Sequence, residues 1–83
     1  MHTASSGFWK RYNELPLDIQ KLAKLQFELL KVDPNHPSLH LKKINSFWSV
    51  RVNQDYRALG KEINSGMIWF WIGSHKDYDK LIG

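Results

Sequence analysis

The chain has no cysteine among its 83 residues, which excludes a disulfide framework and a thiolate metal site. Its polar start, residues 1–6, lacks the apolar core of a secretory signal peptide. The longest apolar run, residues 67–72, is far shorter than the ~20 residues that a membrane-spanning helix needs. We therefore expect a cytoplasmic protein that forms one domain over residues 1–83.

The positive charge is unevenly distributed along the chain. The net charge is +4, with 12 basic and 8 acidic residues. The excess lies in residues 36–61, which contain five basic residues and one acidic residue, Asp55. In the segments on either side, the numbers of basic and acidic residues are nearly equal. A local field of one sign suits an anionic partner, either a nucleic acid or an acidic protein. A solvated surface that is merely basic is the alternative.

Two helices are predicted in the first half of the chain. Residues 8–15 follow the helix-start signal Ser5-Ser6-Gly7 and end before Pro16. The second helix runs from Pro16 to about Asp33, where Pro34 disfavours further helical geometry. Together they predict a helical hairpin. The second helix is expected to bury an apolar face made of Ile19, Leu22, Ala23, Leu25, Leu29, Leu30 and Val32.

After residue 37 the period of the apolar residues changes from 3.6 to 2, which indicates strands. Residues 47–52 and 56–63 form a predicted hairpin around the polar turn 53–55. Residues 67–72 are apolar on both faces, which is typical of a strand covered on both sides, and we predict that they form the central strand. Thr3 and Ala4 are a candidate short edge strand.

A short last helix is predicted over residues 75–82. Ser74 and Asp77 match a capping box, with Ser74 capping the helix. Tyr78, Leu81 and Ile82 would dock this helix on the sheet. The predicted fold is therefore α+β: a helical hairpin on a small twisted antiparallel sheet of three or four strands, followed by a short C-terminal helix.

Arg51 and Arg57 form the first candidate site. They lie on adjoining strands, and a loop with an odd number of residues would place both on one face. Like charges that face each other across a sheet are destabilising, so such a pair suggests that an anion binds between them. The planar guanidinium suits a phosphate. In the alternative, each arginine pairs with a carboxylate such as Asp55 or Glu62.

A second group precedes the first predicted strand. His40, Lys42 and Lys43 would extend the arginine pair into a track for a nucleic-acid backbone, and Lys61 adds to the same positive segment. In the alternative, the lysines protect a sheet edge from aggregation.

His75 and Tyr78 form a third candidate pair. They lie three residues apart at the start of the predicted last helix, so they point to the same side. A helix N-terminus attracts phosphate oxygens and favours neutral imidazole. Neutral His75 could then take a proton from an RNA 2′-hydroxyl or return one to a leaving 5′-oxygen. In the alternative, Tyr78 anchors the core and His75 is an exposed first-turn residue. No spacing of ligands indicates a metal, and we expect no cofactor.

Several segments in combination resemble the toxins of bacterial RelE/ParE toxin–antitoxin modules. They are the run His36-Pro37-Ser38-Leu39-His40-Leu41-Lys42-Lys43, the W-S-x-R motif at 48–51, the Y-R-A-L motif at 56–59 and the I-G-S-H-x-x-Y motif at 72–78. The likeness covers roughly residues 8–82. It implies the α+β fold above and a cognate antitoxin as partner.

For the RelE branch the resemblance implies cleavage of mRNA on the ribosome, without a metal, through attack by a 2′-hydroxyl. By position, Arg57 would stabilise the transition-state phosphate and Arg51 would assist. His75 would be the general acid or base with Tyr78 as its neighbour, and Lys42 and Lys43 would contact the RNA backbone. The main hypothesis is therefore an mRNA endoribonuclease. The alternative is a ParE-like inhibitor of DNA gyrase, or an inactive toxin of the same fold that acts by protein binding.

Overall fold

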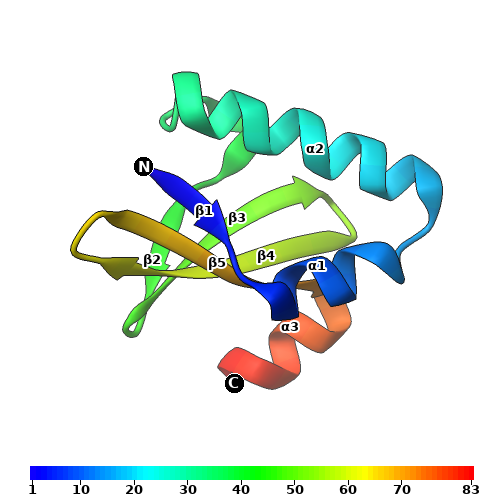
Figure 1. The fold of residues 1–83 in the computed structure, drawn as a ribbon. Coiled ribbons are helices and arrows are strands. Elements are labelled where there is room, and N and C mark those ends of the chain that lie inside the picture. Colours follow the sequence, from blue (N-terminus) through cyan, green and yellow to red (C-terminus); the bar gives the residue numbers. More distant parts are fainter.

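The computed structural model describes all 83 residues and contains one sheet and three α-helices (Figure 1). The strands lie in the order β1-β5-β4-β3-β2. β1 is parallel to β5, and the other pairs are antiparallel. No helix is long and apolar enough to cross a membrane. In chain order the elements are β1 (His2–Ala4), α1 (Ser6–Asn13), α2 (Leu17–Val32), the 3₁₀ helix η1 (Pro37–Leu39), β2 (Lys42–Ile44), β3 (Phe47–Asn53), β4 (Tyr56–Ile63), β5 (Gly66–Ser74) and α3 (His75–Ile82).

The helix boundaries follow local chemistry, largely as predicted. The Ser5 side chain accepts a hydrogen bond from the Phe8 N–H (3.2 Å) and begins α1. α2 starts after Pro16 and ends before Asp33, because Pro34 disfavours helical geometry at the residue that precedes it. Ser74 caps α3 by accepting from the Asp77 N–H (3.1 Å). The capping interaction predicted for Ser74 is therefore confirmed.

The two faces of the sheet have different coverings. α2 lies along one face and α3 lies against the other (Figure 1). The larger core is on the α2 side, and the buried Val50, Val52, Ala58, Trp69 and Ile72 of the sheet contribute to it. The smaller cluster on the α3 side joins Leu59, Trp71 and Tyr78. Residues that alternate along one strand thus belong to different clusters, as the period of 2 requires.

The sheet is larger than predicted. We predicted three or four antiparallel strands, but the sheet has five. It is a mixed sheet, because β1 pairs in parallel with β5. β2 pairs with β3 and was not predicted, since three residues carry too little periodicity to reveal a strand. The prediction of residues 67–72 as the central strand was also wrong, because β4 occupies the middle of the sheet.

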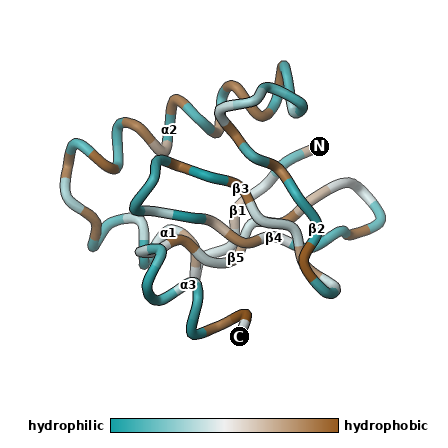
Figure 2. The backbone as a smooth tube through the Cα atoms, turned by 180° about the vertical axis from the view of Figure 1, so that it is seen from behind, coloured by the Kyte–Doolittle hydropathy of each residue, from teal (hydrophilic) through white to brown (hydrophobic).

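The predicted apolar face of α2 is narrower than the sequence suggested. Ile19, Ala23 and Leu30 are buried, but Leu25 is 67% exposed and Val32 is exposed as well. Hydrophobic and hydrophilic residues alternate along α2 in Figure 2. On α3, Tyr78 is buried and Ile82 is partly buried, whereas Leu81 is exposed. Leu81 therefore does not dock the last helix.

A β-bulge changes the pattern of β5. Leu59 pairs with Trp71 and Gly60 pairs with Trp69, so Phe70 is an extra residue in β5. As a result, Phe70 and Trp71 both pack with the cluster on the α3 side. Trp69 points to the opposite face and is almost fully buried.

Two leucines of α2 test the assignment of its buried face. Leu30→Ala is expected to lower the free energy of unfolding by about 2–5 kcal/mol, because the side chain is 1% exposed and its loss leaves a cavity. Leu25→Ala is the matched control and is expected to change the free energy of unfolding by less than about 0.5 kcal/mol. Urea denaturation measures both values. Equal losses in the two variants would contradict the orientation of α2.

The attachment of β1 is expected to weaken at acidic pH. The Trp69 indole N–H donates to Nδ1 of His2 (3.1 Å), which requires this nitrogen to be unprotonated. Burial lowers the pKa of His2 from its ordinary value of 6.5, and the N-terminal ammonium and Lys31 lower it further. Since the fold favours the neutral ring, this contribution to stability is complete above pH 6.5 and declines as the pH falls toward the lower folded-state pKa.

The measurement is the free energy of unfolding between about pH 7.5 and about pH 5, for wild type and His2→Phe. Wild type is expected to lose more stability than the variant over this range. Identical losses would show that protonation of His2 does not affect the attachment of β1.

Candidate active site

Arg51 and Arg57 lie directly opposite each other on β3 and β4. The turn contains two residues, Gln54 and Asp55, rather than the three expected, but a bulge in β3 restores the alignment. Arg51 and its neighbours therefore alternate as predicted, with Val50 and Val52 buried on the α2 side. Both arginine side chains are on the α3 side of the sheet.

The Arg57 guanidinium is held by the backbone of its own hairpin. Its Nη1 donates to the carbonyl oxygen of Tyr56 (3.0 Å) and to that of Asn53. On β5 its cross-strand neighbour is Gly73. The Trp71 ring lies so close to Gly73 that a Cβ added there would be 2.6 Å from the indole. Gly73 thus permits the indole to pack beside the arginine.

Neither arginine is neutralised by a carboxylate. The ion pairs of the structure are Lys31–Glu28 and His75–Asp79. Glu62 instead accepts a hydrogen bond from the Trp48 indole N–H (2.8 Å). The predicted alternative, in which the arginines pair with Asp55 or Glu62, is therefore not observed.

The charge of the pair affects its own ionisation. Burial lowers the pKa of Arg57 from its ordinary value, and the adjacent positive charge of Arg51 lowers it further. Tyr78, Asp79 and Asp55 act in the opposite direction without reversing the shift. Arg57 remains a cation, but its charge is less favourable here than in a free side chain, and an anion at this position would relieve the repulsion.

The start of α3 is fixed to the hairpin that carries the arginines. The backbone N–H of His75 donates to the carbonyl oxygen of Asp55 in the β3–β4 turn (2.7 Å). This bond places the backbone of His75 at the same end of the sheet as the arginine pair. His75 Nδ1 lies 3.2 Å from Asp79 Oδ2. In the neutral ring the nearby carboxylate favours the tautomer with the proton on Nδ1, which leaves Nε2 as the proton acceptor.

Tyr78 is a packed side chain in this structure. It is 3% exposed and lies in the cluster with Leu59 and Trp71. The His75 ring meets the Tyr78 ring edge to face, with 5.8 Å between the centroids. The Tyr78 hydroxyl is buried without a hydrogen-bond partner. The side chain can therefore support the imidazole, but its hydroxyl is not accessible to a substrate in this conformation.

The second predicted group is divided between the two faces of the sheet. His40 Nε2 lies 3.4 Å from Arg51 Nη1, so it belongs to the arginine cluster. Lys42 is opposite Ser49 on β3, which alternates with Arg51 and shares its face. Lys43 is opposite Trp48, which packs against the core on the α2 side, so Lys43 lies on the other face.

Lys61 is on the arginine face but farther along β4. The alternation from Arg57 through Leu59 places it there. Four residues of a strand span ~13 Å, so Lys61 is not part of the immediate cluster.

Sequence reasoning missed two residues of this region. Asp79 lies four residues after His75 on the same helix, and the i, i+4 rule could have found the pair. Arg11 places its guanidinium carbon 5.8 Å from the centroid of the Trp71 ring. It comes from α1, and no local pattern links it to β5. No group of three His, Cys, Asp or Glu side chains is arranged to hold a metal ion.

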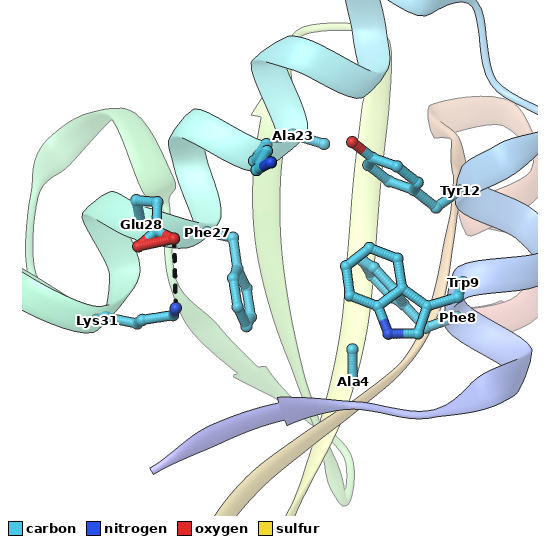
Figure 3. A pocket seen from close by; sticks show the side chains of 9 residues that line it. Ala4, Phe8, Trp9, Tyr12, Ala23, Phe27, Glu28 and Lys31 are labelled. Carbon is cyan, nitrogen blue, oxygen red and sulfur yellow. Dashed lines mark hydrogen bonds and ion pairs between the residues drawn. The ribbon is translucent and has the colours of Figure 1, made fainter.

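A separate cavity of about 370 Å³ lies between β1, α1 and α2 (Figure 3). Trp9, Phe8 and Tyr12 of α1 face Phe27 of α2 across it, and Ala4 of β1 lies on the same side as Trp9. The Glu28–Lys31 ion pair is at its rim. The lining is mainly apolar and contains neither the arginines nor the histidines of the candidate site.

Comparisons with known proteins assign the chain to a family. The family model of the ParE-like toxin domain matches residues 17–80. No curated protein matches the sequence. A chain of the RelB–RelE antitoxin–toxin complex from Methanococcus jannaschii is similar in structure, with a TM-score of 0.74 and 20% identity over 98% of this chain and 99% of that one.

The conserved hypothetical protein HP0894 from Helicobacter pylori is also similar, with a TM-score of 0.62 and 18% identity over 90% of this chain and 93% of that one. At these identities the two structures show a common fold. Since the family match covers most of the sequence, the chain belongs to the ParE-like toxin domain family, and hence to the RelE/ParE superfamily of toxins of toxin–antitoxin modules.

Proposed function

We propose that this toxin is an mRNA endoribonuclease that acts on ribosome-associated mRNA and thereby inhibits translation. The observation that carries the proposal is the opposed pair Arg51–Arg57, which no carboxylate neutralises, beside a histidine oriented by Asp79. A cationic pair of this kind matches a phosphodiester, and the oriented imidazole supplies an acid–base group.

The proposed step is transesterification within the RNA. His75 Nε2 takes the proton of a 2′-hydroxyl while O2′ forms a bond to the adjacent phosphorus. The bond from phosphorus to the 5′-oxygen breaks, and that oxygen takes a proton from solvent or from an imidazolium. The products are a 2′,3′-cyclic phosphate and a free 5′-hydroxyl. Asp79 Oδ2, 3.2 Å from Nδ1, would favour the required tautomer, in which Nδ1 carries the proton.

The arginines would act on the phosphate. Charge builds on the non-bridging oxygens as O2′ attacks, and preorganised donors aimed at them stabilise the transition state. Arg57 suits this role because backbone carbonyls already hold its guanidinium. Arg51 and His40 would bind the same phosphate or its neighbour. Tyr78 would position His75 rather than react.

Other residues and partners complete the proposal. Lys42 and Lys61, on the arginine face, would contact the RNA backbone, whereas Lys43 faces away from this track. The ribosome would orient the mRNA, because proximity and orientation can supply much of the rate enhancement of a site with few catalytic groups. A cognate antitoxin is proposed as a protein partner from the likeness to a RelB–RelE complex.

A second candidate is a ParE-like inhibitor of DNA gyrase, or an inactive toxin of this fold that binds a protein. The observation that favours it is the family match, which is to the ParE-like toxin domain. In that case the arginine pair would bind an acidic surface of the target protein, and His75 would have no chemical role.

Induced expression in bacteria, with mapping of mRNA 5′ ends, separates the two candidates. Wild type is expected to generate new 5′ ends. His75→Ala should reduce cleavage by about 10²–10⁴-fold, because it removes the acid–base group. Arg57→Ala should reduce it by about 10²–10³-fold, because it removes a donor to the transition-state phosphate.

His36→Ala is the matched control, since His36 is exposed and bonds only within its own loop. It should cleave like wild type. Growth arrest with intact mRNA and gyrase trapped on DNA would contradict the endoribonuclease proposal and support the second candidate.

A further inference from the structure

α3 covers only part of the sheet face that carries the arginines. Its buried residue Tyr78 packs over Leu59 and Trp71. Toward the β2–β3 and β4–β5 turns the same face is open, and Phe47 is 36% and Ile63 40% exposed. The strand pairings place one set of apolar side chains on this open part: Ile44, Phe47, Ile63, Ile68 and Phe70.

Two phenyl rings meet at the centre of this surface. Phe47 comes from β3 and Phe70 from β5, and β4 runs between these strands. Their ring centroids are nevertheless 5.3 Å apart, with 61° between the ring planes. The rings therefore reach toward each other over β4. The bulge at Phe70 makes this possible, because it turns an additional aromatic side chain to this face.

The charged side chains that the strands present around these rings are all cationic. Lys42, Arg51, Arg57 and Lys61 are the charged side chains that the strands present on this face. The one carboxylate within β2–β5 belongs to Glu62, which points to the other face and bonds to Trp48. Asp55 and Asp79 lie near Arg57, at the end of this face that α3 covers. An apolar aromatic surface whose strand-borne charges are all cationic fits a polyanion with aromatic groups, which is the chemistry of single-stranded nucleic acid.

We infer that Phe47 and Phe70 form a base-stacking platform for the RNA strand whose phosphate reaches Arg51 and Arg57. This inference rests on the proposed function and adds a binding subsite to it. Lys61 lies ~13 Å along β4 from Arg57, so it would hold a neighbouring part of the RNA backbone while a base stacks on the rings. A second copy of this chain fits the surface less well, since it would bring like charges together.

The test separates base stacking from cleavage and from phosphate binding. A fluorescent single-stranded RNA with 2′-O-methyl groups cannot undergo attack by its 2′-oxygens, so anisotropy reports binding alone. An abasic oligonucleotide of the same length provides the same phosphates without bases. Wild type is expected to bind the base-bearing strand roughly 5- to 150-fold more tightly than the abasic strand, from the contribution of one stacked base.

Phe47→Leu and Phe47→Leu/Phe70→Leu keep apolar side chains but remove the aromatic faces. They are expected to lose most of this preference while their affinity for the abasic strand stays the same. Phe27→Leu is the matched control, because Phe27 is a partly buried phenylalanine on the α2 side. It should retain the wild-type preference.

An unchanged preference in the double variant would overturn the inference, as would an equal loss of affinity for both strands. Wild-type dimers that the double variant converts to monomers, with RNA binding unchanged, would assign the surface to self-association and also overturn it. The proposed function is judged separately by the mapped mRNA ends. Base-dependent binding without cleavage would reject the nuclease and keep the platform.

Discussion

The pairing of β3 with β4 sets two guanidinium groups opposite each other, and the candidate site depends on this register. Like charges placed across a sheet destabilise it, and here neither arginine forms an ion pair with a carboxylate. The hairpin compensates in part by hydrogen-bonding Arg57 to two of its own carbonyl groups. The same turn accepts the first backbone bond of α3 through Asp55, so one hairpin positions both the arginines and His75.

The larger hydrophobic core lies on the opposite face of the sheet from the arginines. Trp69, Leu30 and Leu39 are almost completely buried on the α2 side, and removing such apolar surface from water contributes about 25 cal/mol per Å². The α3 side is packed less extensively, with a small cluster around Leu59, Trp71 and Tyr78. The larger part of the buried core thus lies on the α2 side, and the opposite face carries Arg51 and Arg57 without ion pairs.

The sequence predicted the elements that have strong local signals. The Ser74 cap defined α3, and Pro16 and Pro34 bounded α2. Arg51 and Arg57 share a face as predicted, but the predicted three-residue loop is a two-residue turn, and a bulge in β3 restores the alignment. β1 and β2 are strands of three residues, which is too short for a clear alternating pattern. The sequence therefore indicated β1 only as a candidate edge strand and did not predict β2.

Other features depend on tertiary packing that periodicity does not contain. Leu25 continues the apolar spacing of α2 yet is exposed, so the spacing alone does not tell which of these residues meets the sheet. The bulge that brings Phe70 to the arginine face is not visible in an apolar run that is hydrophobic at every position. Arg11 approaches Trp71 only because α1 packs beside β5.

The most direct test of the opposed arginine pair is thermal unfolding in inorganic phosphate against chloride at matched ionic strength. If the pair binds phosphate, the Tm of wild type should rise by about 4–8 °C for each 1 kcal/mol of stabilisation, which grows with the phosphate concentration c as RT ln(1 + c/Kd). Lys21→Gln, which removes an exposed charge from α2, should show the same rise, whereas Arg51→Gln should lose most of it. An equal rise in all three proteins would contradict an anion site between Arg51 and Arg57.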